Sequence, residues 1–416
     1  MRILKLTPQL EKKLLARREQ SDVEAQRIAS EIISDVRKRG DAALLGWTRK
    51  LDDPAIRLKD FWFSQKEIRA AERQVSPDFL RAIGLAARNI RRVAEKQLPR
   101  PWSLEVEPGV RISQRVEAIE SIGCYIPGGR FSLVSTLLMT AVPAQVAGVP
   151  HILAVCPKPN NELLAAANFL GLHKIARIGG AQAIAALAYG TPSIPRVEKI
   201  CGPGNKYVTA AKQLISADCA IDLPAGPTEA IVLAERGNAR WIAADLLAQA
   251  EHAEDAASFL VTTSASLARE VHRELKWQLA ELPAGAATAS TTLAGGILIA
   301  NSLEQACEFV NRFAPEHLSL PSDSGTLLRQ IRSSGTIFIG PWAAQPLGDY
   351  VTGSNHVLPT AGWARRRGGL SAADFVKCIT VQAISQKGFL SLAGAAESMA
   401  EAEGLLAHRN AVRIRR

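Results

Sequence analysis

Aromatic side chains are scarce in this sequence, and uninterrupted apolar segments are rare. Phe, Trp and Tyr together make up 5% of the 416 residues, so aliphatic side chains must fill most of the core. Apolar residues account for 47% and charged residues for 22%, a balance typical of globular proteins that excludes intrinsic disorder, collagen and coiled coil. At roughly 150 residues per domain, the length indicates two or three domains.

The sequence also contains no clear signal for secretion or for insertion into a membrane. The first 20 residues have neither a long apolar stretch nor a small-residue cleavage site, so they do not resemble a secretory signal. Residues 131–157 carry no charge and are long enough to span a bilayer, but Pro143, Gln145, Pro150 and His151 interrupt them. We therefore expect a buried helix and a buried strand there, no membrane partner, and a cytoplasmic protein.

None of the six cysteines forms a C-x-x-C pair. A chain of this length does not need disulfides, so reduced thiols in a cytoplasmic protein are the simpler interpretation. An alternative is that Cys124 or Cys201 attacks an aldehyde as a nucleophile. No histidine stands near either residue in the sequence to lower the pKa of the thiol, which disfavours that alternative.

The net charge of +10 is concentrated near the N-terminus. Residues 1–115 hold 25 Lys and Arg against 16 Asp and Glu. Acidic residues interleave with the basic ones throughout, so solvated helix faces explain the charge better than binding to nucleic acid does. We expect no nucleic-acid partner. The triplet 365–367, three arginines beside two glycines, indicates a loop that meets anionic groups or solvent.

Hydrophobic periodicity predicts an α/β protein. Residues 21–50 and 64–98 have the pattern of amphipathic helices. Between residues 119 and 215, short apolar runs and helical segments alternate four times, and the alternation resumes after residue 228. This pattern is typical of β-α-β units, so we expect two parallel-sheet modules in tandem, split near residue 228. Residues 371–416 look helical, with a face that packs on another subunit.

Glycine turns follow the strands of the first predicted module. The turns are Gly128-Gly129, Gly179-Gly180 and Gly202-Pro203-Gly204. None completes G-x-G-x-x-G, because a tyrosine stands in the third position of GPGNKY. Three such turns at one sheet edge still favour a bound nucleotide, since glycine lets the backbone approach a phosphate. Tyr125, Gln182 and Asn205 stand beside the turns, either as ligand contacts or as partners of the loop backbone.

Residues with metal-binding and acid–base chemistry occur mainly in the second half. Gln249 and His252 lie three apart on a predicted helix and therefore share a face at the edge of its buried stripe. An imidazole there either bonds a backbone carbonyl or binds a metal. The adjacent Glu316 and His317 are either a half-buried pair or an acid and a base. Further candidates are Asp349, His356, Glu403 and His408.

Eight motifs occur in the order of one known family. They are CYIPGG, GGAQAIAALAYG, GPGNKYV, DLPAGPTE, LLAQAEH, APEHL, GDYVTGSNHVLPT and EGLLAHRNAV. On these motifs the chain resembles the histidinol dehydrogenase family from about residue 20 to the end. The resemblance implies oxidation of L-histidinol to L-histidine through the aldehyde, with two NAD per turnover, by a zinc-dependent homodimer with shared active sites.

The resemblance also implies the fold and its boundaries. It implies two tandem, incomplete Rossmann-like parallel-sheet modules with helical N- and C-terminal segments in a domain-swapped dimer. The implied parts are an N-terminal segment at 1–20, a first module with the catalytic and metal residues at 21–120 and 229–370, a second, NAD-binding module at 121–228, and a helical dimerisation segment at 371–416.

Residue roles follow from the resemblance motif by motif. Glu316 and His317 correspond to the family's catalytic pair, in which His317 takes the alcohol proton and Glu316 activates water in the second half-reaction. The implied zinc ligands are Gln249, His252, Asp349 and His408. The implied NAD contacts are Tyr125, Gln182 and Asn205. The implied substrate contacts are Thr228, Gln249, His252, His317, Asp349, Glu403 and His408.

Three departures from the family pattern border the implied site. Thr228 replaces the usual serine but keeps the hydroxyl, Gln345 replaces a glutamate, and the usual ARFSS is ARRRGG at residues 364–369. Two alternatives therefore accompany the main prediction. One is a paralogue that oxidises another small polar alcohol, such as a sulfonated diol, and the other is a basic nucleic-acid-binding protein that keeps only the fold. Glu403 disfavours the first, and the complete ligand set disfavours the second.

Overall fold

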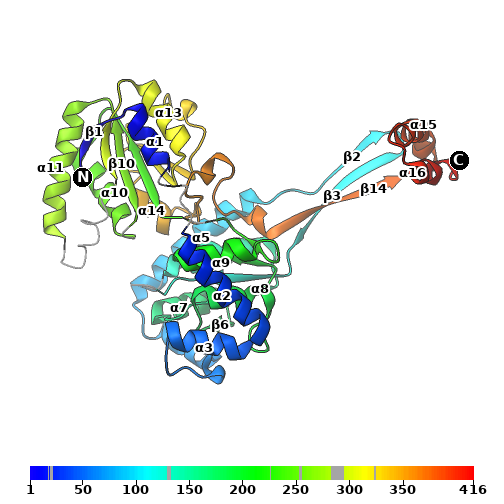
Figure 1. The fold of residues 1–416 in the computed structure, drawn as a ribbon, viewed down its shortest axis with the longest axis horizontal. Coiled ribbons are helices and arrows are strands. Elements are labelled where there is room, and N and C mark those ends of the chain that lie inside the picture. Colours follow the sequence, from blue (N-terminus) through cyan, green and yellow to red (C-terminus); the bar gives the residue numbers. More distant parts are fainter. Residues whose placement is uncertain are drawn as a thin grey trace.

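The computed structural model describes residues 1–16, 18, 22–128, 133–224, 226–252, 255–282, 295–322 and 325–416. Two parallel-sheet modules lie side by side, and an antiparallel ribbon projects from them (Figure 1). The predicted α/β class and the split between two sheets near residue 228 are confirmed. Gly129 of the first predicted glycine turn lies outside the described residues.

The first sheet has five parallel strands in the order β6-β5-β4-β7-β8. All five residues of the central strand β4 are buried, which explains the continuous apolar run in its sequence. The strands are β4 (Ser121–Tyr125), β5 (His151–Val155), β6 (Ile175–Ala176), β7 (Lys199–Cys201) and β8 (Ala220–Ile221). The helices between them are α6 (Val134–Ala147), α7 (Asn161–Phe169), α8 (Gly180–Tyr189) and α9 (Lys206–Ile215).

Four helices that precede this sheet in the sequence pack on it. They are α2 (Val23–Arg39), α3 (Asp41–Leu51), α4 (Gln65–Glu72) and α5 (Pro77–Gln97). The sequence predicted two longer helices, but Gly40, with φ of 55°, and Pro77 separate each into two. Helix α2 contacts α8 and α9, α4 contacts α7, and α5 contacts α6. Residues 23–97 therefore share two cores mainly with 121–221, and Val357 and Leu370 of the implied first module join the second of these cores.

The second sheet has six parallel strands in the order β1-β11-β10-β9-β12-β13. The N-terminal strand β1 pairs with β11 at the edge of the sheet, so strands nearly 300 residues apart in the sequence complete one sheet. The strands are β1 (Ile3–Lys5), β9 (Glu229–Leu233), β10 (Ala257–Thr262), β11 (Gly296–Ile299), β12 (His317–Leu320) and β13 (Thr336–Ile339). The helices are α1 (Pro8–Ala16), α10 (Ala239–Ala250), α11 (Ala265–Glu281), α13 (Leu303–Phe313) and α14 (Gln345–Tyr350).

A three-stranded antiparallel arm extends away from both modules (Figure 1). It consists of β2 (Trp102–Glu107), β3 (Val110–Ala118) and β14 (Val376–Ile384), and it carries α15 (Gln386–Ala402) and α16 (Leu406–Arg413) at its tip. The prediction that 371–416 is entirely helical is wrong, because β14 pairs with β3 along nine residues. Apolar side chains on the arm, including Leu104 and Val381, remain exposed.

The structure tests the expectations for the uncharged segment 131–157 and for the cysteines. No helix in the described part of the chain is long and apolar enough to cross a membrane. The described part of 131–157 forms α6 and β5, as expected. All six cysteines lie in the described part of the chain, and none of them forms a disulfide. Burial raises the pKa of Cys124 to about 12 and that of Cys201 well above its ordinary value, so neither thiol is a nucleophile near neutral pH.

Candidate functional site

Residues that the sequence singled out meet between the two modules. Tyr125 and the glycine turns lie at the carboxyl ends of strands in the first sheet. Thr228 and Glu316 instead precede β9 and β12, two neighbouring parallel strands, at the amino edge of the second sheet. Gln249 reaches that edge because it lies in the last turn of α10, the helix that follows β9. The two groups therefore approach each other across one cleft.

A chain of side-chain hydrogen bonds links α14 to the catalytic candidates. The side-chain amide of Gln345 donates to Oε1 of Gln249, whose own amide donates to Oγ1 of Thr228. The Thr228 hydroxyl in turn donates to Oε2 of Glu316. That oxygen also accepts the backbone N–H of Glu229 at 3.0 Å. The carboxylate of Glu316 is thus held by one oxygen, which leaves Oε1 to act on a ligand.

His317 is buried between two carboxylates. Its Nδ1 lies 3.8 Å from Oε2 of Glu316, and its Nε2 lies 3.4 Å from Oδ1 of Asp349. Burial alone would lower the pKa of His317, but the charges of Glu316 and Asp349 outweigh it, so the pKa is raised. Neither ring nitrogen makes an aligned hydrogen bond within the described residues, so both can still serve a ligand.

The predicted metal ligands of this chain come together only in part. Gln249 is fully buried. Helix α10 ends at Ala250, so His252 lies beyond it, exposed, with Nδ1 3.2 Å from the carbonyl oxygen of Ala248. The prediction that both residues lie on one helix is therefore wrong. Burial would raise the pKa of Asp349, but nearby imidazoles, first His317 and also His252, lower it, which places His252 and Asp349 in one electrostatic environment.

Glu403 and His408 lie far from the other site residues in this chain. Both are exposed at the tip of the arm, where Figure 1 shows α16 well away from α10 and α14. Among the described residues, no three or more His, Cys, Asp and Glu side chains cluster closely enough to hold a metal ion. Gln249, Asp349 and His252 between them offer an amide oxygen, a carboxylate and an imidazole. Such donors suit zinc if one further ligand is supplied.

The predicted cofactor contacts surround the glycine turns. The hydroxyl of Tyr125 accepts the backbone N–H of Gly180 at 3.1 Å. Gln182 donates to Asp52 at 2.9 Å, while its buried Oε1 has no hydrogen-bond partner in the described part of the chain. A buried amide oxygen of this kind calls for a donor, which the hydroxyls of a dinucleotide can provide. The side chain of Asn205 caps α9 by accepting two backbone N–H groups.

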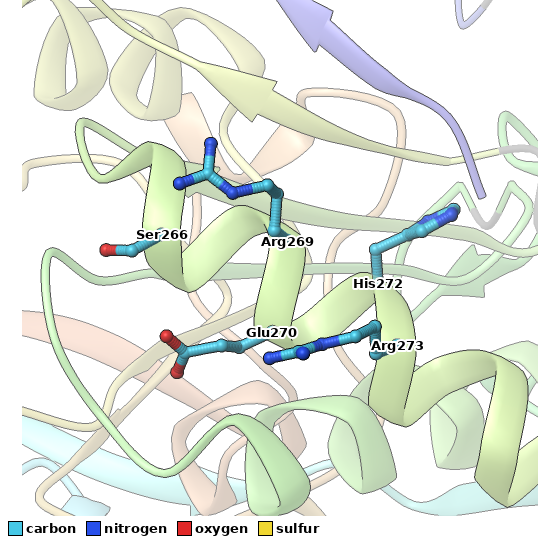
Figure 2. Close-up of a pocket in the computed structure, with 5 residues that line it drawn as sticks. All are labelled: Ser266, Arg269, Glu270, His272 and Arg273. Atoms are coloured by element: carbon cyan, nitrogen blue, oxygen red, sulfur yellow. The ribbon is translucent and has the colours of Figure 1, made fainter.

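A cleft of about 940 Å³ is lined by members of both groups of residues. Asn205 lines it from the first module, and Thr228 and His252 line it from the second. Its volume is at the upper end of those typical of small-molecule sites. A smaller hollow of about 330 Å³ lies apart on α11, where its lining residues project from one helix (Figure 2). The hollow contains none of the predicted site residues, so the cleft is the candidate site.

Comparison with known proteins identifies the family. The family model of histidinol dehydrogenase matches residues 15–416. The chain belongs to the histidinol dehydrogenase family. It is 44% identical to the histidinol dehydrogenase of Methanosarcina barkeri over 93% of this chain and 90% of that one, and 42% identical to that of Aquifex aeolicus over 97% and 95%. The crystal structure of histidinol dehydrogenase from Elizabethkingia anophelis superposes with a TM-score of 0.94 at 37% identity, covering 100% of this chain and 98% of that one.

Membership of the histidinol dehydrogenase family makes this chain an oxidoreductase. Motifs identify the site residues in the sequence, but no motif indicates the ion pair beneath them. Arg18 binds the buried carboxylate of Glu229 at 2.5 Å, which anchors the N-terminal segment directly behind Thr228. Burial raises the pKa of Glu229 to about 7 although Arg18 opposes the shift. No pattern in the sequence links two residues so far apart.

A second buried ion pair in this histidinol dehydrogenase family member holds the turn beside Asn205. The ammonium of Lys212 binds Oδ1 of Asp222 and donates to the carbonyl of Gly202 at 2.8 Å. Oδ2 of Asp222 accepts the N–H of Gly202 at 2.7 Å. Gly202 has φ of 119°, and a Cβ there would lie 2.1 Å from the carbonyl oxygen of Tyr125. Only glycine fits this turn, and the ion pair fixes its position.

We expect Lys212→Met to lower the free energy of unfolding by about 3–5 kcal/mol, because it leaves the buried carboxylate of Asp222 without its counter-ion. Urea unfolding measures the change. Lys206→Met is the matched control, since Lys206 pairs with Asp22 at the surface, where solvent screens the charges, and its loss should cost far less. Equal losses in the two variants would contradict the role given to the buried pair.

Proposed function

We propose that this chain oxidises L-histidinol to L-histidine through L-histidinal, in two successive hydride transfers to NAD at a zinc-dependent site. These are the last steps of histidine biosynthesis. The observation that carries the proposal is the buried His317, 3.4 Å from Asp349 and 3.8 Å from a Glu316 that is itself fixed by Thr228. Relatives over 40% identical along nine-tenths of the chain bear the name histidinol dehydrogenase, which supports the same substrate.

The side chains divide the proton chemistry between them. His317 accepts the proton of the alcohol, which its two neighbouring carboxylates favour by stabilising the imidazolium that forms. Glu316 then withdraws a proton from water in the second half-reaction, using the oxygen that Thr228 does not hold. Thr228 and Gln249 keep the carboxylate in a fixed orientation, so little reorganisation accompanies either step.

The donor set indicates where the cofactors would be held. Gln249, His252 and Asp349 would hold zinc, because their amide oxygen, imidazole and carboxylate are suitable ligands. Gln345 uses one lone pair of the Gln249 oxygen and leaves the other for a metal. Tyr125, Gln182 and Asn205 would contact NAD. When bound, zinc supplies a Lewis acid that orients and polarises the substrate, and NAD supplies the hydride acceptor.

We further propose a homodimer in which each site is shared. His408 would be the remaining zinc ligand and Glu403 a substrate contact, both donated by the arm of a second copy. The arm supports this arrangement because it carries both residues away from their own module (Figure 1) and exposes large apolar side chains such as Trp102 and Met399. A two-fold axis would exchange the arms and produce two equivalent sites.

The expected result of the deciding assay is NADH formation at 340 nm with L-histidinol, about two NADH per substrate consumed, and histidine as the product. Other amino alcohols and sulfonated diols, assayed in parallel, test the paralogue alternative raised by Gln345. Dialysis against a chelator should abolish turnover, and added zinc should restore it. Full activity in metal-free protein, or faster oxidation of a diol, would contradict the proposal.

A further inference from the structure

Three consecutive arginines occupy residues 365–367, and the first two of them lie in the candidate cleft. Arg365 and Arg366 both line the cavity that also contains Asn205 and Thr228. Arg365 is the last residue of the short 3₁₀ helix η4 (Trp363–Arg365), and Arg366 follows it directly. Both arginines are exposed to solvent. Two guanidinium groups, which stay charged at any physiological pH, therefore face the space where a ligand would bind.

Neither arginine is neutralised by a carboxylate within the described residues. Nη1 of Arg365 donates to the backbone carbonyl of Arg312 at 2.5 Å, which holds the side chain but leaves its charge. The guanidinium of Arg366 lies 5.0 Å from the centre of the Trp363 ring, a cation–π contact that restrains the guanidinium without neutralising it. By contrast, Arg367 donates to Asp374 at 2.9 Å and to the carbonyl of Asp222, so it is structural.

The rest of the cleft does not balance these two charges. Lys206 is paired with Asp22 at 2.8 Å, and Arg18 with a buried glutamate. Asp255 is the remaining acidic side chain of the described lining, one negative charge against two positive ones. The N-terminus of α9 is no substitute site, because Asn205 already accepts two of its N–H groups at 3.1 Å. An anion in this cleft would be bound by the arginine side chains.

We propose that Arg365 and Arg366 form a binding site for a phosphate monoester on a ligand of the cleft. A terminal phosphate carries up to two negative charges and three acceptor oxygens, which two planar guanidinium forks match better than a single ammonium does. Two ligands present this group: a dinucleotide phosphorylated on its ribose, as in NADP, and the phosphate ester of the alcohol substrate. The ester has no free hydroxyl at the reacting carbon, so it binds without being oxidised.

Only the identity of these two ligands rests on the proposed function. Calorimetric titration of the zinc-loaded protein tests the site without turnover, by comparing NADP with NAD and the phosphate ester of L-histidinol with L-histidinol. We expect the phosphorylated member of one pair to bind roughly tenfold or more tightly. The pair that shows this preference identifies the source of the phosphate. The preference should weaken as salt is added, because the guanidinium groups are exposed.

The double variant Arg365→Gln/Arg366→Gln should abolish the preference and leave the Kd of the unphosphorylated ligands within about twofold. Arg329→Gln is the matched control, an exposed arginine that does not line the cleft. Equal affinities within both pairs in the unaltered protein, or a preference that survives in the double variant, would overturn the proposal. A phosphate preference in a protein that fails to oxidise L-histidinol would reject the proposed reaction and leave this site supported.

Discussion

Replacing Glu316 with Gln is expected to slow the oxidation of supplied L-histidinal by about 10²–10⁴-fold while oxidation of the alcohol continues at a smaller loss. The amide removes the basic oxygen that would activate water, yet its carbonyl can still accept the Thr228 hydroxyl and the Glu229 N–H. His317→Asn should show the opposite pattern, with the larger loss in the alcohol step. Stopped-flow measurement of NADH with each substrate separates the two steps.

Ser319→Ala serves as the control for these two variants. Ser319 is buried on the same strand and face as His317 but belongs to none of the hydrogen bonds that hold the site. It should keep both rates within about twofold, because its hydroxyl has no proposed role in either step. Equal loss of the two steps in Glu316→Gln would show that the carboxylate does not act in the second step alone.

Two inactive variants should restore activity when they form a mixed dimer. His252→Asn removes a proposed zinc ligand next to α10, and His408→Asn removes a proposed zinc ligand at the tip of the arm (Figure 1). If the arm of one copy completes the site of the other, a mixed dimer carries both defects in one site and none in the other. Random reassociation gives about half mixed dimers, so roughly a quarter of all sites should recover.

The experiment dissociates the two variants together, refolds them with zinc and measures NADH formation. His252→Asn mixed with Gln249→Ala is the negative control, since both changes lie on the body and every site keeps at least one defect in any pairing. Background activity in the His252 and His408 mixture, with mixed dimers demonstrated by mass spectrometry, would reject sharing and show that each arm serves its own chain or no site.

The local sequence pattern was sufficient to predict most helices and strands, but not which elements pack against each other. The buried strands β4 and β9 were predictable because each is a short apolar run bounded by breakers. The packing of α2 against α8 and α9 was not predictable. An amphipathic pattern shows that a helix has a buried face, but it does not show which elements cover that face. Helix ends were similarly uncertain, so the position of His252 beyond α10 was missed.

The arm shows the other limit of sequence reasoning. Strand β14 was predicted as helix because its apolar residues have no buried face in a single chain and so give no clear period. In the candidate site, motifs identified Glu316, His317 and Asp349, whereas the hydrogen bonds among Gln345, Gln249 and Thr228 depend on three-dimensional neighbours. Chemistry was therefore predictable from residue type, and orientation was not.

The edge strand β1 ties the order of synthesis to the order of folding. Its partner β11 lies at Gly296–Ile299, so β1 leaves the ribosome roughly 15–60 seconds before that partner at ordinary elongation rates. Helices α2 to α5 and the first sheet, all encoded before residue 222, can assemble within that interval. The first module can therefore fold before the second sheet is complete, while β1 waits for β11 as a strand without its partner.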